Sequence, residues 1–184
     1  MADSAQRMGR TAHLRRAGAD DARLLAQLGA RLFEQAFGAA NDPENMRLYL
    51  AGAFSVEQQG AELADSDRAT WIAEDAGKAA VGYVMLCNRS AAPAAGALAP
   101  AEIQRVYVDR AWHGQQVGNA LIDACTVQAR AWHCDVIWLS VWEENARAIA
   151  FYRKMGFEAV GAQTFMLGHD AQRDIVMSKA VSTA

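Results

Sequence analysis

The chain has 184 residues, of which 52% are apolar and 21% are charged. This length fits one domain, and the apolar share supports a buried core, which excludes a largely disordered chain. Eighteen basic against 21 acidic residues give a net charge of −3, which argues against nucleic acid as a partner. No apolar run approaches the roughly 18 residues of a membrane span, and the polar segment 1–10 lacks the apolar core of a signal peptide. We therefore expect a flexible N-terminus over 1–10, a single domain over 11–180, a cytoplasmic location and no membrane partner.

The cysteines and histidines do not form a recognisable site. Cys87, Cys125 and Cys134 lie in apolar stretches without a CxxC spacing, which is typical of buried reduced thiols in a cytoplasmic protein. The histidines show no metal-ligand spacing, so no metal is expected.

The first third of the chain is predicted to be mostly helical. A short strand over 11–16 precedes a helix that ends near Phe37, for which Asp20 and Asp21 supply an N-cap and a first-turn acid. Pro43 suits the first position of a second helix over 44–53. Ser55, with Gln58 three residues later, forms a capping-box pattern for a third helix that ends near Ala64.

The remainder alternates strands and helices. Helices are expected over 115–131 and 145–155, and a loop rich in alanine and proline over 91–101. Strands are expected over 70–74, 80–87, 103–108, 136–141, 157–167 and 174–179. Only one stretch resembles a strand–helix–strand crossover, so the fold class is α/β with a mixed, largely antiparallel sheet.

The segment 106–121 (VYVDRAWHGQQVGNAL) joins the end of a predicted strand to a helix. The first backbone N–H groups of a helix have no internal partner, and the helix dipole adds partial positive charge there. Gly114 and Gly118 allow a ligand to approach the backbone closely. The segment therefore predicts an anion site suited to a pyrophosphate; a purely structural loop of the same spacing is the alternative.

A second pattern lies in 136–157 (VIWLSVWEENARAIAFYRKMGF), where a strand leads into a helix that Gly156 ends. Asn145 and Tyr152 are seven residues apart, and at about 100° per residue they share one helix face. Asn145 also fits a helix N-cap, and the two roles can coexist. Together the two segments resemble the acetyl-CoA loop and the Asn-to-Tyr helix of the GNAT superfamily of N-acetyltransferases, over about residues 11–180.

The resemblance implies a GNAT fold, in which helices flank a mostly antiparallel sheet that splays open at a parallel strand pair, here 103–108 and 136–141. It implies acetyl-CoA as the co-substrate, with Asn145 at the pantetheine amides and Tyr152 protonating the leaving thiolate. Lys154 is either a partner of a cofactor phosphate or a solvated helix charge. The implied cofactor-binding residues are Val106, Tyr107, Val108, His113, Gly114, Gln115, Gln116, Val117, Gly118, Asn119, Asn145, Tyr152 and Lys154.

The loop departs from the superfamily pattern Arg/Gln-x-x-Gly-x-Gly/Ala. His113 stands at the first position of this pattern and Gln116 at its first glycine, while Gly118 keeps the second. We therefore expect the Gln116 side chain either to point away from the phosphates or to contact them.

The outer segments 43–55 and 161–174 resemble those of PaiA-type polyamine acetyltransferases. This resemblance implies a small-molecule amine as the partner, with spermidine or spermine as the acceptor. The chain has no activated-nucleophile pattern, which favours direct transfer in a ternary complex. Because such an amine is mostly protonated at pH 7, a base is expected, and Glu102 is the catalytic candidate beside Tyr152. Further pocket candidates are Tyr107, Glu34, Asp42 and Glu143.

Several alternatives stay open. The acceptor could be a protein N-terminus, a lysine or an aminoglycoside-like amine, and the chain could be a sensor of acetyl-CoA or polyamine without turnover, against which Tyr152 and Asn145 argue. A dinucleotide-binding oxidoreductase would need Gly-x-Gly-x-x-Gly, which is absent. A monomer or a homodimer is expected.

Overall fold

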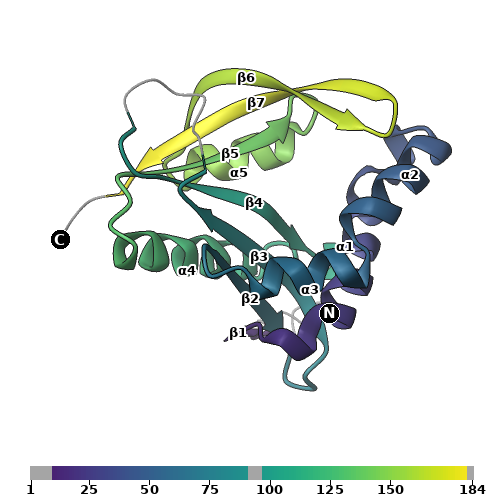
Figure 1. The fold of residues 1–184 in the computed structure, drawn as a ribbon, viewed down its shortest axis with the longest axis horizontal. Helices are drawn as coiled ribbons and strands as arrows, with labels where there is room; N and C mark the ends of the chain where they lie inside the picture. Colours follow the sequence, from purple (N-terminus) through teal and green to yellow (C-terminus); the bar gives the residue numbers. More distant parts are fainter. Residues whose placement is uncertain (1–9, 91–96, 182–184) are drawn as a thin grey trace, which may run out of the picture.

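The structure is a computed structural model that describes residues 10–90 and 97–181. The N-terminus expected to be flexible lies outside these residues except for Arg10, and so does much of the loop expected over 91–101. Within the described residues, seven strands form one sheet in the order β1-β2-β3-β4-β5-β7-β6 (Figure 1). Every neighbouring pair is antiparallel except β4 and β5, which are parallel. The predicted mixed sheet with one parallel pair is confirmed.

The elements follow the predicted order. The helices are α1 (Ala22–Phe37), α2 (Pro43–Ala53), α3 (Val56–Ala64), α4 (Val117–Ala131) and α5 (Ala146–Lys154). Short 3-10 turns precede α1 (Ala19–Asp21), follow it (Gly38–Ala40) and follow β4 (Arg110–Trp112). The strands are β1 (His13–Arg16), β2 (Arg68–Glu74), β3 (Ala80–Asn88), β4 (Pro100–Val108), β5 (Val136–Trp142), β6 (Glu158–Leu167) and β7 (Asp170–Ala180).

Some boundary predictions were wrong. Pro100 opens β4 instead of lying in a loop, because the first residue of a strand tolerates proline and the Asp135 carboxylate holds the preceding backbone through the N–H groups of Leu98 and Ala99. β7 begins at Asp170, four residues earlier than expected. Asp21 does not cap α1 with its side chain, since its carboxylate pairs with Arg15 at 2.7 Å.

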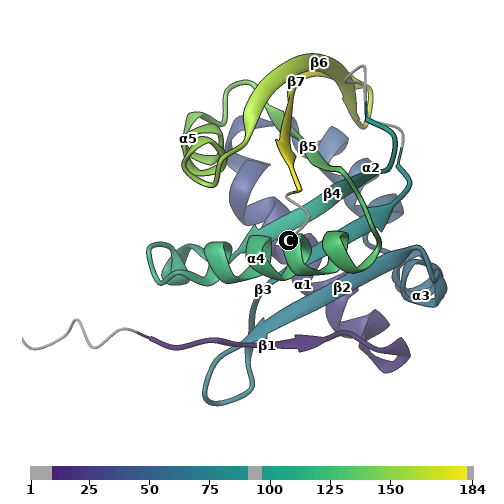
Figure 2. The ribbon, with the colours of Figure 1, turned by 90° about the vertical axis from the view of Figure 1, so that its left-hand side faces the viewer.

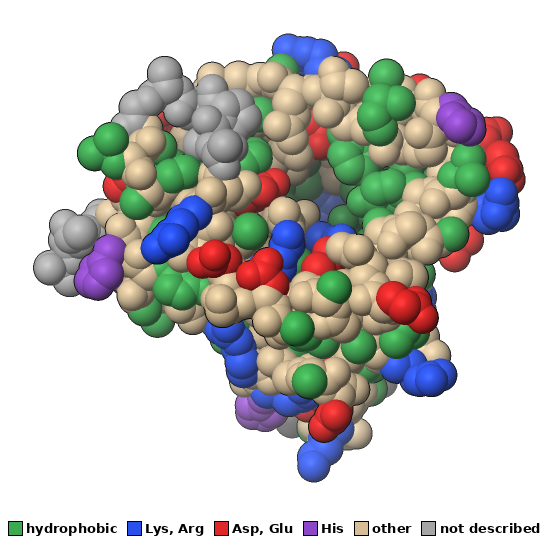
Figure 3. Space-filling view, viewed as in Figure 1, with side chains coloured by type: hydrophobic (Ala, Val, Ile, Leu, Met, Phe, Trp, Pro, Cys, Tyr) green, Lys and Arg blue, Asp and Glu red, His purple; other side chains and the backbone are tan. Residues whose placement is uncertain are grey.

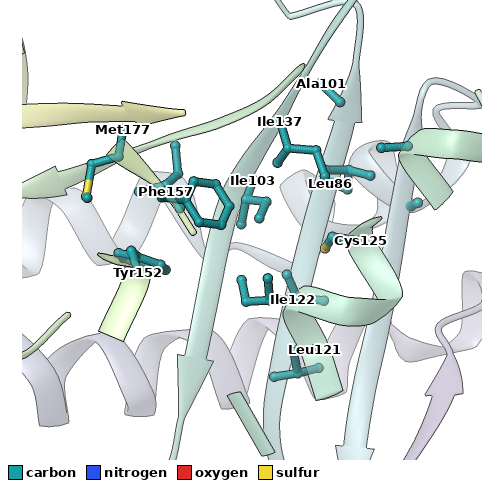
Figure 4. Packing of buried hydrophobic residues seen from close by; sticks show 14 of the residues in the cluster. Leu86, Ala101, Ile103, Leu121, Ile122, Cys125, Ile137, Tyr152, Phe157 and Met177 are labelled. Atoms are coloured by element: carbon teal, nitrogen blue, oxygen red, sulfur yellow. The ribbon is translucent and has the colours of Figure 1, made fainter. Parts of the chain in front are cut away.

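The helices form two layers on opposite faces of the sheet. On one face, α1 packs on β3 and β4, α3 on β2, and α2 reaches β6; on the other face, α4 packs across β2 to β5 (Figures 1 and 2). The largest core cluster lies on the α4 side, where Leu121, Ile122 and Cys125 of α4 face the sheet (Figure 4). Tyr152 of α5 and Phe157 belong to the same cluster. Cys125 and Cys134 are buried free thiols as expected, whereas Cys87 is only partly buried.

In the described parts of the chain, no helix is both long and apolar enough to cross a membrane. Within the same residues, no group of three or more metal-ligating His, Cys, Asp or Glu side chains lies together.

Candidate active site

The parallel strand pair opens into a cavity. β4 and β5 are paired only through the first three residues of each strand, from Pro100 opposite Val136 to Glu102 opposite Trp138. Beyond Glu102 the two strands diverge, as expected for 103–108 and 136–141. A cavity of about 630 Å³ occupies the opening, and its lining includes residues from β4 and β5. The molecular surface is hollowed between the β6–β7 arm and the layer of α1 and α3 (Figure 3).

A β-bulge in β4 determines which side chains line each side of the cavity. Ile103 pairs with Leu86, but Arg105 pairs with the adjacent Met85, so β4 carries one extra residue at Gln104. As a result Ile103, Val106 and Val108 all pack toward the α4 core. Tyr107 packs instead toward α1, with its ring 6.0 Å from that of Phe33. The cavity therefore passes through the sheet, with one end on the α4–α5 face and the other on the α1–α2 face.

The backbone of β4 faces the opening at alternate residues. Asp109 donates its N–H to Val81 O of the β3 side at 2.8 Å. In an antiparallel ladder the direction of the backbone groups alternates, so those of Val106 and Val108 point away from β3 and into the opening. His113 Nε2 lies 2.9 Å from Val108 O, so that carbonyl already has a partner.

The turn before α4 has a left-handed backbone conformation at two positions, one of which is not a glycine. Gly114 has φ +79° and Gln116 has φ +64°, so the position of the missing glycine is left-handed although a glutamine fills it. Within the described residues, the Gln116 side chain makes no capping hydrogen bond to α4. The N–H groups of Val117, Gly118 and Asn119 begin the helix at the cavity. These N–H groups have no partner within the helix, which is the arrangement that the prediction of an anion site requires.

Cationic side chains line the same cavity. Arg110, Arg147 and Lys154 line the cavity. Burial lowers the pKa of His113, and the nearby positive charges of Arg147 and Arg110 lower it further. His113 is therefore neutral at pH 7. Its hydrogen bond to Val108 O links the turn to β4 without adding a positive charge.

α5 places Asn145 and Tyr152 on the cavity wall. Asn145 Oδ1 accepts the N–H of Ala148 at 3.1 Å, so Asn145 does cap the helix. Tyr152 is 8% exposed, and its ring lies 5.3 Å from Phe151 and 5.9 Å from Phe157. Burial raises the pKa of Tyr152, which keeps its hydroxyl protonated and able to donate.

The α1–α2 side of the cavity holds a carboxylate that the sequence interpretation missed. Asp174 of β7 lines the cavity and is 5% exposed. Its Oδ2 accepts a hydrogen bond from Ser140 Oγ of β5 at 2.8 Å. Among the residues described in 10–90 and 97–181, it is the one acidic side chain of the lining. Aromatic side chains surround this end of the cavity: Phe33, Phe37, Tyr49, Tyr107, Trp142 and Phe165. We call this end the acceptor chamber.

Other residues predicted from the sequence lie outside the cavity lining. Glu102 stands at the closed end of the β4–β5 pair, where its carboxylate accepts a hydrogen bond from Ser90 Oγ at 2.5 Å. Asp42 caps α2 through the N–H groups of Glu44 and Asn45. Glu143 pairs with Arg173 at 2.6 Å. Gln115 and the exposed Glu34 are likewise absent from the lining.

Comparison with known proteins agrees with this geometry. The acetyltransferase (GNAT) family profile matches residues 29–157. An uncharacterized N-acetyltransferase of Mycobacterium bovis is 32% identical over 157 residues, which cover 85% of this chain and 96% of the relative. The chain therefore belongs to the GNAT family of acetyltransferases.

Solved structures show the same fold. The PaiA N-acetyltransferase of Thermoplasma acidophilum, solved in complex with coenzyme A, has a TM-score of 0.74 and 18% identity over 92% of this chain and 99% of that chain. The spermidine/spermine N-acetyltransferase SpeG of Vibrio cholerae has a TM-score of 0.61 and 19% identity over 93% of each chain. The expected GNAT fold is confirmed. The chain is an acetyl-CoA-dependent N-acetyltransferase, as the family resemblance implied.

Proposed function

We propose that this enzyme transfers the acetyl group of acetyl-CoA directly to a primary amine of a small cationic molecule, with spermidine or spermine as the first candidates. One observation carries the proposal: the cavity is continuous through the sheet, from Tyr152 on the α5 side to the acceptor chamber. Two substrates that enter from opposite faces can therefore meet at the opening between β4 and β5, and no acyl-enzyme is needed.

The α4–α5 side suits acetyl-CoA. The N–H groups of Val117, Gly118 and Asn119 would bind the pyrophosphate, assisted by Arg147 and Lys154. The backbone of Val106 and the backbone N–H of Val108 would pair with pantetheine amides, as would the side-chain amide of Asn145. The hydroxyl of Tyr152 would then give its proton to the departing thiolate.

Two features favour a polyamine acceptor. Two segments resemble PaiA-type enzymes, 43–55 and 161–174. They lie together, and Asn45 Oδ1 accepts the N–H of His169 at 2.9 Å. The acceptor chamber beside them combines aromatic walls with a carboxylate, which suits an alkylammonium group.

A second acceptor class is favoured by the charge of the chamber. Asp174 is the one acidic side chain among the described lining residues, so the chamber itself balances a single ammonium group. A monoamine with an apolar body, such as an arylalkylamine, would fill the aromatic walls equally well.

Release of free CoA from acetyl-CoA tests the proposal with a panel of amines. The panel contains spermidine, spermine, putrescine, phenethylamine, a peptide with a free N-terminus, a lysine peptide and an aminoglycoside. Saturable turnover that favours spermidine or spermine supports the polyamine assignment, whereas a preference for phenethylamine supports the monoamine. If none of these amines turns over although acetyl-CoA binds, the proposed acceptor class is wrong.

A further inference from the structure

The two carboxylate oxygens of Asp174 have different surroundings. Oδ2 accepts the hydrogen bond from Ser140 Oγ, whereas Oδ1 is buried without a hydrogen-bond partner among the described residues. A buried carboxylate oxygen without a partner is costly to the folded state. The simplest reason for retaining such an oxygen at a cost to stability is that a ligand supplies the missing partner.

The groups around Asp174 leave its charge without a counter-charge. Arg105 of β4 lines the same cavity, but Glu62 of α3 accepts hydrogen bonds from both of its terminal nitrogens. Tyr49 of α2 interacts electrostatically with Asp174 and is protonated, since burial raises its pKa. Arg173, the neighbour of Asp174 in β7, pairs with Glu143.

We infer that Asp174 Oδ1 receives the amino group of the acceptor and takes its proton, while Ser140 holds the carboxylate in position. The inference deepens the proposed function and rests on it. An ammonium group supplies both the hydrogen-bond donor and the positive charge that Oδ1 lacks. The rings of Tyr49 and Trp142 line the same chamber and would stabilise the cation further.

Burial makes Asp174 a better proton acceptor. Desolvation raises the pKa of Asp174, and the hydrogen bond from Ser140 opposes this rise. A carboxylate with a raised pKa lies closer to the pKa of an amine, so proton transfer between them is less unfavourable.

The protons and bonds of the reaction then balance. Asp174 takes one proton from the ammonium group, and the neutral nitrogen forms a bond to the acetyl carbonyl carbon. The carbon–sulfur bond breaks with its electron pair on sulfur, and Tyr152 protonates that sulfur. The nitrogen loses a second proton as the amide forms, and this proton restores the Tyr152 hydroxyl. Asp174 releases its proton to solvent.

The test compares Asp174→Asn with Asp123→Asn, a matched change at an exposed position of α4. With the best amine of the panel, Asp174→Asn should lower kcat/KM for the amine by roughly 100-fold and leave KM for acetyl-CoA within about twofold. Asp123→Asn should leave both parameters unchanged. The thermal midpoint of Asp174→Asn should equal or exceed that of the wild type, because the variant removes a buried charge.

The pH profile separates proton transfer from packing. In the wild type, kcat/KM for the amine should level off once Asp174 is ionised. In Asp174→Asn it should keep rising about tenfold per pH unit toward the pKa of the free amine, because only amine that is already neutral can react. Ser140→Ala removes the hydrogen bond that lowers the pKa of Asp174. It should therefore move the rising part of the pH profile of kcat/KM to higher pH than in the wild type. This variant keeps the test decisive if Asp174→Asn does not fold.

Two results would overturn the inference. If the wild type turns over an amine and neither Asp174→Asn nor Ser140→Ala changes kcat/KM or its pH profile, the inference is wrong and the proposed function stands. If the wild type neither acetylates any panel amine nor binds one in calorimetry with CoA present, both fail together.

Discussion

Gly118 of α4 lies against the ring of Phe151 of α5: a Cβ on this glycine would be 3.1 Å from the Cζ atom of the ring. Both helices contribute to the proposed acetyl-CoA side of the cavity: α4 with its first N–H groups, and α5 with Asn145 and Tyr152. The glycine is needed here for space and not for backbone freedom, because it lies within a regular helix. The contact therefore sets the distance between the first turn of α4 and Tyr152.

Replacement of Gly118 by alanine should weaken cofactor binding. Gly52 of α2 provides the control, since nothing lies within 4 Å of its hypothetical Cβ. Gly52→Ala should raise the free energy of unfolding by about 0.5–1 kcal/mol through helix propensity. Gly118→Ala should gain less than this or lose stability, and it should weaken acetyl-CoA binding by a factor of about 3–10. Urea unfolding measures the free energy of unfolding, and calorimetry measures the affinity for acetyl-CoA. If Gly118→Ala stabilises the protein as much as Gly52→Ala and leaves this affinity unchanged, the steric argument is contradicted.

The left-handed turn at Gln116 predicts a stabilising substitution. A non-glycine residue at φ +64° is strained, so Gln116→Gly should raise the free energy of unfolding by about 0.5–1 kcal/mol. Gln116→Val should lower it by more than about 1 kcal/mol, because a β-branched side chain tolerates this conformation poorly. Acetyl-CoA binding should be kept in the glycine variant. A destabilised glycine variant would show that the Gln116 side chain makes a contact that outweighs the strain.

The sequence predicts the elements well because their signals are local. Periodic apolar residues mark α1 and α4, Pro43 marks the start of α2, and Ser55 marks the start of α3, where its side chain accepts the N–H of Gln58. The anion turn was also predictable in place, although its left-handed conformation at Gln116 was not. No local pattern requires glutamine to adopt that conformation.

The acceptor side was not predictable because it depends on contacts between distant elements. Asp174 reads as an ordinary polar residue at the start of a strand, and its burial arises only when β5, β6 and α2 surround it. Glu102 was a reasonable base from its place in the chain. The parallel register with Trp138 puts it at the closed end of the strand pair instead. A strand register of this kind is set by long-range pairing and not by the residues of one strand.

The turn between β6 and β7 should affect amine binding in the acceptor chamber. Gly168 has φ +60°, and a Cβ there would lie 2.7 Å from the Asn45 Cα atom of α2. Gly168→Ala should therefore lower the free energy of unfolding by about 1–3 kcal/mol and raise KM for the amine, with little change in acetyl-CoA affinity. Gly161→Ala in β6 is the control, since its Cβ would meet no atom within 4 Å. Similar effects of the two substitutions would exclude a specific role for the turn.

The stability difference between Asp174→Asn and the wild type should depend on pH. The folded-state pKa of Asp174 is raised above its ordinary value of 3.8. The wild type therefore carries no penalty below that value, where the carboxyl is protonated in both states, and loses stability as the pH rises through the folded-state pKa. Asparagine does not titrate, so its advantage should grow from about pH 4 upward and then become constant. Urea unfolding of both proteins at several pH values measures it, and a constant difference would show that the Asp174 pKa is not raised.

Tyr152→Phe tests the acid role directly. Phenylalanine keeps the ring contacts with Phe151 and Phe157 but cannot protonate a thiolate. Turnover should fall at least about tenfold, while acetyl-CoA affinity and the thermal midpoint should stay close to wild type. Because burial raises the pKa of Tyr152, the wild-type rate should show no loss near pH 10, where an exposed tyrosine would ionise. An acetyl-donor thioester with a more acidic leaving thiol should regain part of the lost rate, since its thiolate departs without an acid. Unchanged turnover in Tyr152→Phe would remove this residue from the acid role.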